Sequence, residues 1–191
     1  MVKLMNFKET ILEGVIEINP FFADDIRGNF IKDYSDEIFK KNNIKFNVAE
    51  IFYTKSKKGV VRGVHFQRVK QQQKLIRCIE GCIFDVIVDL RKNSPTFKKW
   101  IAFELTEDNN KEILIPGGCA HGFLALKDSI VSYKCDEKFY GEYDDGIIWN
   151  DKNLDVKWPI EFIDSKPRVI LSDKDKSLQS FNEFMERYGG F

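Results

Sequence analysis

The clearest pattern along the chain is a strict alternation of side chains between positions 82 and 90. Every even-numbered position there is apolar, whereas Asp85 and Asp89 fall on the opposite face. Because successive side chains of a strand point to opposite faces, this period predicts a half-buried strand. A second strand, 74–80, leads into it through Gly81, the expected hairpin turn.

Other short apolar segments are separated by turn residues and predict strands of similar length. They lie at 48–55, 60–66, 99–105, 112–115, 121–126 and 129–135. Strands at this density, with short turns and no helices between them, favour a mainly β fold, an antiparallel sandwich or barrel.

Helical periodicity is confined to the flanks of this β region. A short helix is expected at 36–42. Apolar residues recur at three- and four-residue steps near the end of the chain, at Leu178, Phe181, Phe184, Met185 and Tyr188. They predict an amphipathic C-terminal helix over about 172–188, capped by Ser172 or Asp173 and packed on the body of the protein. We expect one domain over 1–191, with an N-terminal extension and this helix at its end.

The composition is that of a globular protein without a charge bias. Hydrophobic residues make up 43% of the 191 residues, and 30 basic residues balance 30 acidic ones. This balance provides no general attraction to nucleic acid or to an anionic membrane. No apolar run approaches the ~18 residues of a membrane span, and the first residues lack the apolar core of a signal peptide. We therefore expect a cytoplasmic protein that binds neither nucleic acid nor membrane.

Metal-ligating residues are too few to predict a metal centre. The four cysteines follow a C-x3-C spacing and then wide gaps, unlike the paired knuckles of zinc sites. His65 and His121 are the only histidines, and using both as ligands would leave no imidazole for acid–base work. We expect reduced thiols and no metal.

Segment 59–67 places Arg62 and His65 in an otherwise apolar strand. Burying such groups costs free energy unless they are paired or face a cavity. The alternative is a strand that enters solvent with an ordinary surface arginine. Positions three apart point to opposite faces of a regular strand, so a shared cavity requires a β-bulge, for which Gly63 is the candidate.

Three further side chains each have a structural and a chemical interpretation. His121 follows a glycine-rich turn, where a lone histidine is more often structural than catalytic. Tyr133 shares a strand face with Val131 and Cys135, and a buried tyrosine usually does no more than hydrogen-bond its hydroxyl. Asp175 is either an acid at a helix N-terminus or a carboxylate that orients a histidine.

Together, six segments in register resemble the dTDP-4-dehydrorhamnose 3,5-epimerase family over about 21–176. They are GVVRGVHFQ (59–67), KLIRCIEGCIFDVIVDLRKNSPTFKKW (74–100), IPGGCAHGF (115–123), SYKC (132–135), GIIWND (146–151) and LSDKD (171–175). The resemblance implies a cupin-like antiparallel jelly roll, a homodimer, and neither metal nor organic cofactor. It also implies a nucleotide-diphosphate-linked 4-keto-6-deoxy sugar as substrate. Carbons 3 and 5 would be inverted by proton removal and return through an enolate, in the biosynthesis of a surface-polysaccharide sugar.

The same resemblance implies roles for individual residues. His65 is expected to be the base, Asp175 the carboxylate that orients it, and Tyr133 the acid. The expected substrate-binding residues are Arg27, Phe30, Glu50, Phe52, Arg62, Gln67, Lys74, His121 and Tyr140.

Within that set, Arg62, Lys74 and His121 would surround the keto oxygen or the sugar and stabilise the developing negative charge. Arg27 would contact the diphosphate from the partner subunit, because its planar fork bonds two oxygens. Phe30 matches an aromatic residue of the family.

Two positions depart from the family pattern. Members commonly carry a Gln-x-Asn pair before the strand of the base, where this chain has Glu50 and Phe52. The replacement changes what the pocket can hydrogen-bond. It leaves open whether the nucleotide is dTDP or GDP and whether the sugar is a hexose or a heptose.

Other functions predict other residues. A metal-dependent cupin oxygenase typically shows H-x-H followed by Glu, but Gly63 stands two positions before His65. A sugar-binding module without turnover would not need Tyr133, His65 and Asp175 together. Inversion of a single carbon, or a 3,4-ketoisomerase reaction, stays open, because the sequence does not decide how many carbons react.

Overall fold

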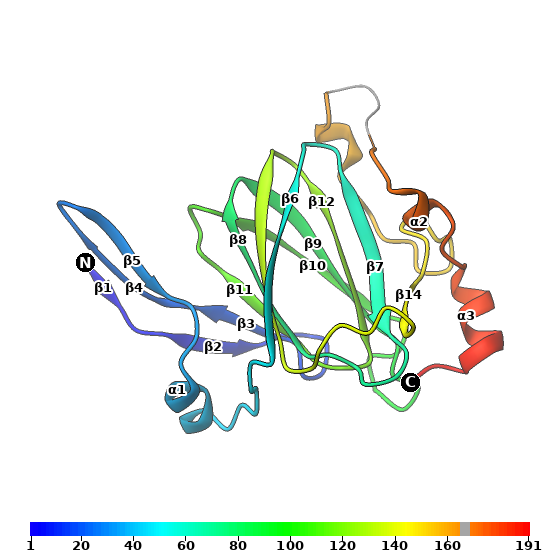
Figure 1. The fold of residues 1–191 in the computed structure, drawn as a ribbon, viewed down its shortest axis with the longest axis horizontal. Coiled ribbons are helices and arrows are strands. Elements are labelled where there is room, and N and C mark those ends of the chain that lie inside the picture. Colours follow the sequence, from blue (N-terminus) through cyan, green and yellow to red (C-terminus); the bar gives the residue numbers. More distant parts are fainter. Residues whose placement is uncertain (165–168) are drawn as a thin grey trace.

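The computed structural model describes residues 1–164 and 169–191, and its strand pairs are antiparallel throughout the three sheets (Figure 1). The strands are β1 (Val2–Lys3), β2 (Asn6–Glu9), β3 (Ile16–Asn19), β4 (Phe21–Asp25), β5 (Gly28–Lys32), β6 (Glu50–Ser56), β7 (Val61–Gln67), β8 (Lys74–Glu80), β9 (Cys82–Asp89), β10 (Trp100–Thr106), β11 (Glu112–Ile115), β12 (Cys119–Ala125), β13 (Ser129–Cys135) and β14 (Asp144–Gly146). The helices are α1 (Asp36–Lys41), the 3-10 turn η1 (Ile160–Phe162), α2 (Asp173–Lys176) and α3 (Phe181–Tyr188).

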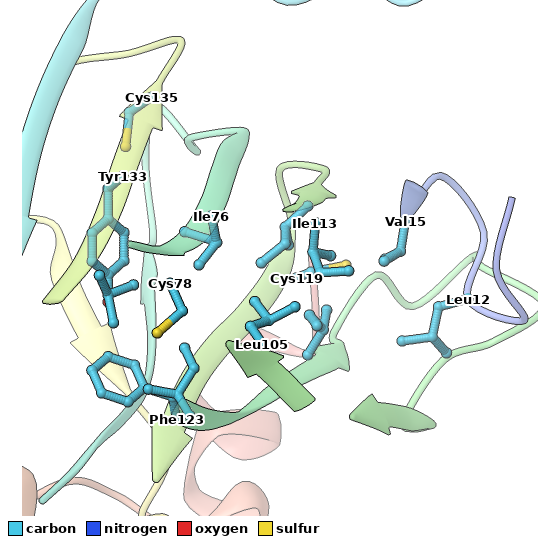
Figure 2. Close-up of a cluster of buried hydrophobic side chains, with 14 of the residues drawn as sticks. Leu12, Val15, Ile76, Cys78, Leu105, Ile113, Cys119, Phe123, Tyr133 and Cys135 are labelled. Atoms are coloured by element: carbon cyan, nitrogen blue, oxygen red, sulfur yellow. The ribbon is translucent and has the colours of Figure 1, made fainter. Parts of the chain in front are cut away.

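Two large sheets face each other and form the jelly roll. One has the order β10-β9-β12-β7-β14, and the other has the order β2-β3-β11-β8-β13-β6. Apolar side chains from both sheets meet between them, among them Ile76 and Cys78 from the six-stranded sheet and Leu105 and Phe123 from the five-stranded one (Figure 2). The predicted cupin-like, mainly β fold is confirmed.

The strand with the clearest alternation, β9, is buried on both faces, so the prediction of a half-buried strand is wrong. Asp85 and Asp89 are both 0% exposed. The apolar face of β9, with Val86 and Val88, is covered by residues of the C-terminal region such as Phe184. The aspartates point the other way and find partners inside the protein, which alternation alone does not reveal.

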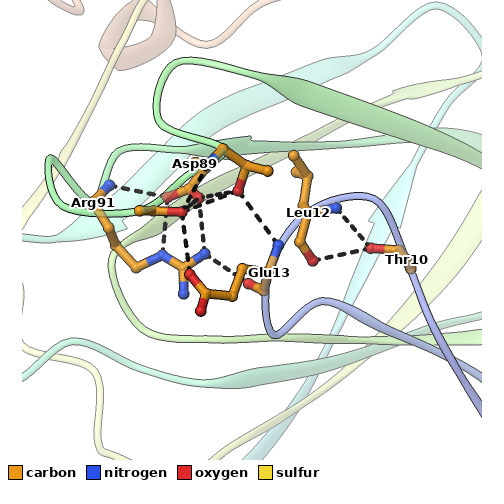
Figure 3. Close-up of polar contacts among 7 residues, drawn as sticks. Thr10, Leu12, Glu13, Asp89 and Arg91 are labelled. Carbon is orange, nitrogen blue, oxygen red and sulfur yellow. Dashed lines mark hydrogen bonds and ion pairs between the residues drawn. The ribbon is translucent and has the colours of Figure 1, made fainter.

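Asp89 anchors a polar network at one end of this strand (Figure 3). Its carboxylate accepts hydrogen bonds from the side chains of Arg91, Ser94 and Thr96, at 2.5 to 2.9 Å. Arg91 also donates to the carbonyl of Glu13, at 2.6 Å. Burial would raise the pKa of Asp89, but these hydrogen bonds outweigh it and lower the pKa. The network ties the loop after β9 to the N-terminal segment.

The expected C-terminal helix over 172–188 is divided in two. Ser172 caps α2 by accepting from the backbone N–H of Asp175, and Ser180 caps α3 in a capping box with Glu183. Each Ser begins a new helix because its side chain satisfies the first free backbone donors. The buried face of α3 packs on the five-stranded sheet, as predicted.

The N-terminal extension forms strands that the sequence pattern did not predict. In Figure 1, β1, β4 and β5 extend as a separate sheet, hereafter the arm, on the side of the molecule away from α2 and α3. Ile26 at its tip is 102% exposed, and Phe30 is 58% exposed. None of the helices in the described residues is long and apolar enough to cross a membrane.

Candidate active site

A cavity opens on the jelly roll beside β6, β7 and β13 and reaches α2. Eight of the twelve predicted site residues line it: Phe52, Arg62, His65, Gln67, Lys74, His121, Tyr133 and Asp175. Arg27, Phe30, Glu50 and Tyr140 are not among its lining residues.

His65 and Asp175 form a hydrogen-bonded pair in the wall of this cavity. His65 Nε2 lies 2.7 Å from Asp175 Oδ1. The same carboxylate accepts from the Ser172 hydroxyl at 2.5 Å and from the Gly63 N–H at 3.3 Å. Burial would raise the pKa of Asp175, but the hydrogen bonds of His65 and Ser172 outweigh it and lower the pKa to about 2. The carboxylate is therefore ionised at neutral pH and fixes the imidazole's orientation.

A bulge in β7 brings Arg62 and His65 to the same cavity, as predicted. His65 lies opposite His121, and Arg62 lies opposite Phe123. The chain therefore advances by three residues on β7 where it advances by two on β12, which defines the bulge. Gly63, at the bulge, has a φ of +110°, and a Cβ there would lie 2.7 Å from the carbonyl oxygen of His121. Only glycine fits this close approach and this backbone conformation.

A second histidine–carboxylate pair lies beside the first. His121 Nε2 is 2.6 Å from Asp85 Oδ1, and both side chains are almost fully buried. The sequence interpretation missed Asp85, because its alternation with apolar neighbours placed it on an exposed face. One feature of the sequence could have indicated this pair. His121 and Asp85 both lie in segments that resemble the family, and both segments were predicted to be strands; in the structure these strands are neighbours.

Tyr133 is buried between aromatic rings at the cavity wall. Its ring stacks on Phe52, with centroids 4.7 Å apart and an angle of 11°, and meets the edge of His121 at 5.9 Å. Burial, with the nearby charge of Asp85, raises the pKa of the Tyr133 phenol well above its usual value. The phenol is therefore protonated at neutral pH and can donate a proton.

Positive charge faces the same cavity. Arg62 donates to Ser56 Oγ at 3.0 Å and to the carbonyl of Lys55 at 3.1 Å, which fixes its guanidinium. Burial lowers the pKa of Lys74. At the cavity wall, Lys174 donates to Asp144 and so joins α2 to β14.

Three other predicted residues have structural partners. Gln67 holds the loop 138–140 through hydrogen bonds to Lys138 O and from Tyr140 N, at 3.2 and 2.6 Å. The Tyr140 hydroxyl accepts from Lys70, and its neighbour Phe139, which we did not predict, lines the cavity instead. A carboxyl oxygen of Glu50 accepts from the N–H of Phe139 at 3.4 Å.

The arrangement suits proton transfer beside a carbonyl group. A histidine held by a carboxylate can remove a proton, and a protonated phenol in the same cavity can return one. Arginine and lysine side chains in a buried cavity stabilise negative charge that develops on an oxygen.

Comparison with known proteins agrees with this chemistry. A model of the dTDP-4-dehydrorhamnose 3,5-epimerase family matches residues 9–183. A curated dTDP-4-dehydrorhamnose 3,5-epimerase from Methanothermobacter thermautotrophicus is 44% identical over 178 residues, which cover 93% of this chain and 95% of the relative.

Solved structures share this fold over 94% of the chain. The dTDP-6-deoxy-D-glucose-3,5-epimerase of Legionella pneumophila, in complex with dTDP-4-keto-L-rhamnose, has a TM-score of 0.87 at 32% identity, with 94% of each chain covered. ChmJ, a 3'-monoepimerase from Streptomyces bikiniensis in complex with dTDP-quinovose, has a TM-score of 0.84 at 27% identity and covers 94% of this chain and 89% of its own. The chain therefore belongs to the dTDP-4-dehydrorhamnose 3,5-epimerase family, a family of sugar epimerases.

Proposed function

We propose that this epimerase inverts carbons 3 and 5 of a dTDP-linked 4-keto-6-deoxy sugar without a cofactor, in the biosynthesis of a surface-polysaccharide sugar. The observation that carries the proposal is the meeting of the His65–Asp175 pair and Tyr133 in one cavity. The nucleotide is inferred from the relatives, several of which are named for dTDP sugars.

Both carbons are weak acids because each stands next to the keto group at carbon 4. His65 takes the proton from carbon 5 or carbon 3, and the electron pair of the broken C–H bond moves to the keto oxygen as an enolate. Arg62, Lys74 and His121 stabilise that oxygen, each donor contributing on the order of 10²–10³ in rate. Tyr133 then gives its phenolic proton to the opposite face of the carbon. Solvent restores the protonation of both side chains.

A homodimer would complete the substrate site. Arg27 is at the exposed tip of the arm and pairs there with Asp25 at 2.6 Å, so it does not reach the cavity of its own chain. In a dimer, the arm of one subunit would bring Arg27 and Phe30 to the partner's diphosphate site.

Location in the cytoplasm stays a prediction from the sequence.

The similarity to the 3'-monoepimerase supports one alternative, inversion at a single carbon. A GDP-linked sugar or a heptose is a further alternative for the substrate, because Phe52 lines the cavity where the family commonly has an amide.

Proton NMR in deuterium oxide tests the function directly. We expect solvent deuterium at carbons 3 and 5 of the dTDP-linked 4-keto sugar, and slower exchange in the GDP-linked one. His65→Asn should lower both exchange and epimerisation by roughly 10²–10⁴, and Tyr133→Phe should suppress inversion while exchange remains measurable. Exchange at one carbon would support the single-carbon alternative. Undiminished exchange in His65→Asn would overturn the assignment of the base.

A further inference from the structure

Phe52 covers one face of the Tyr133 ring. The two residues are direct cross-strand partners of β6 and β13, and β6 is the edge strand of its sheet. Their rings lie 4.7 Å apart and 11° from parallel. Cross-strand aromatic pairs stabilise a sheet, and a stacked pair contributes beyond the area that it buries.

The other contact of the Tyr133 ring is equally defined. The His121 ring lies 5.9 Å away at 73°, and His121 is itself held by Asp85. Tyr133 is 7% exposed, whereas Phe52 is 36% exposed and lines the cavity. Phe52 therefore covers one face of the Tyr133 ring, while Tyr133 itself still lines the cavity.

We propose that Phe52 is a positioning residue for the acid, which determines how often the enolate is protonated on the face that gives inverted product. This inference rests on the proposed function. A tyrosine ring reaches its substrate through two side-chain torsions, and stacking against a flat partner restricts both. Without that partner, the hydroxyl would spend time away from the carbon, and water would return the proton on either face.

The position next to it on the same face supports this assignment. Thr54 Oγ1 is buried in the cavity wall and lies close enough to the Tyr133 hydroxyl to lower the pKa of that phenol, although burial outweighs this effect. Phe52 and Thr54 both face inward from β6. On this strand, Tyr133 therefore contacts one aromatic ring, on which it stacks, and one small hydroxyl group. An amide side chain in place of Phe52 would offer hydrogen bonds instead of a stack.

The test compares three variants of β6 in deuterium oxide. Phe52→Leu removes the ring but keeps an apolar side chain, and Phe52→Tyr keeps a ring that can stack. Tyr53→Leu is the matched control, because Tyr53 is the next residue on the strand and is 61% exposed. NMR gives the number of inverted carbons for each deuterium incorporated. Phe52→Leu should lower this ratio by about two- to tenfold, the range that the strength of an aromatic pair supports. The other two variants should keep the wild-type ratio.

A second measurement does not depend on turnover. The ultraviolet titration of Tyr133 is isolated by subtracting the titration of the same protein carrying Tyr133→Phe. Because burial raises the pKa of this phenol above its usual 10.0, Phe52→Leu should move it down, whereas Phe52→Tyr should not.

The outcomes separate this inference from the function on which it rests. An unchanged ratio in Phe52→Leu, with inversion impaired in Tyr133→Phe, would overturn the positioning role alone. A lower Tyr133 pKa with an unchanged ratio would likewise show that Phe52 shields the phenol without positioning it. Full inversion in Tyr133→Phe would instead overturn the proposed acid. Should Phe52→Leu fail to fold, Phe52→Met gives the same comparison.

Discussion

Two carboxylates, Asp175 and Asp85, hold the two imidazole rings of the cavity. Asp175 does more than orient a ring, because it also accepts from Ser172 at the start of α2 and from the Gly63 N–H at the bulge of β7. One ionised side chain thereby joins the helix, the bulged strand and the proposed base. Its charge should matter for stability as well as for catalysis.

Replacing Asp175 by Asn should lower the free energy of unfolding at neutral pH by about 2 kcal/mol, because the pKa of Asp175 falls from 3.8 to about 2 on folding. The unfolded chain takes up the proton first as pH falls. The contribution is therefore complete above pH 4 and is lost as pH falls toward 2. Urea unfolding of both proteins at pH 7 and pH 3 checks this. The difference should shrink at the lower pH, and a difference independent of pH would show that the charge of the Asp175 carboxylate is not what stabilises the protein.

At the scale of elements, the outer face of the six-stranded sheet carries a group of charges that the reaction does not use. Glu112 on β11 is 0% exposed, and neither of its carboxyl oxygens has a hydrogen-bond partner among the residues that the structure describes. Arg77 is its cross-strand neighbour on β8. Nearby, Lys134 on β13 donates to Asp33 at 2.6 Å. Burial, aided by the charge of Asp33, raises the pKa of Glu112 well above its usual value.

Glu112→Gln should therefore stabilise the protein at neutral pH. The unfolded chain releases the Glu112 proton near pH 4.5, before the folded protein does, so wild-type stability falls as pH rises above that value. A neutral amide has no such loss, and the expected gain at pH 7 is about 1–3 kcal/mol. Denaturant unfolding at pH 4 and pH 7 measures it. Glu9→Gln, an exposed position on β2, is the control and should show no gain.

At the scale of the whole molecule, the arm has no role in the active site of its own chain. It extends away from the body (Figure 1), and apolar side chains such as Leu4, Ile26 and Phe30 are exposed on or beside it. Exposed apolar groups on a projecting sheet are typical of a contact surface. In the proposed homodimer, the same arm would carry Arg27 to the partner's cavity.

Complementation tests this arrangement. Arg27→Ala and His65→Asn should each inactivate, or nearly inactivate, a homodimer. A hybrid dimer with one chain of each kind would have one intact site, built from the His65 of one chain and the Arg27 of the other. Purified through two different tags, it should show about half of the wild-type activity. Failure to recover activity in a stable hybrid would show that Arg27 does not act across subunits.

Chelation tests the proposed chemistry at the same scale. Each of the two histidines of the chain is already paired with a buried carboxylate, and the proposed reaction uses both of them. Dialysis against EDTA should therefore leave kcat/KM unchanged. Loss of activity that one divalent ion restores would contradict the cofactor-free mechanism.

The local pattern of the sequence was sufficient for many of the strands. The predicted bounds of β8, β11 and β13 agree with the structure, because a two-residue period and turn residues are local properties. The resemblance to the family assigned His65, Tyr133 and Asp175, and the structure brings them to one cavity. The need for a bulge at Gly63 followed from parity alone.

Only the tertiary structure decided which polar side chains are buried. Alternation placed Asp85 on the polar face of its strand, yet the opposing sheet covers that face, and His121 from the neighbouring strand becomes its partner. The stacking of Phe52 on Tyr133 likewise joins residues 81 positions apart. Periodicity reports which side chains share a face of one element. What covers that face depends on segments distant in the sequence, and only their packing determines it.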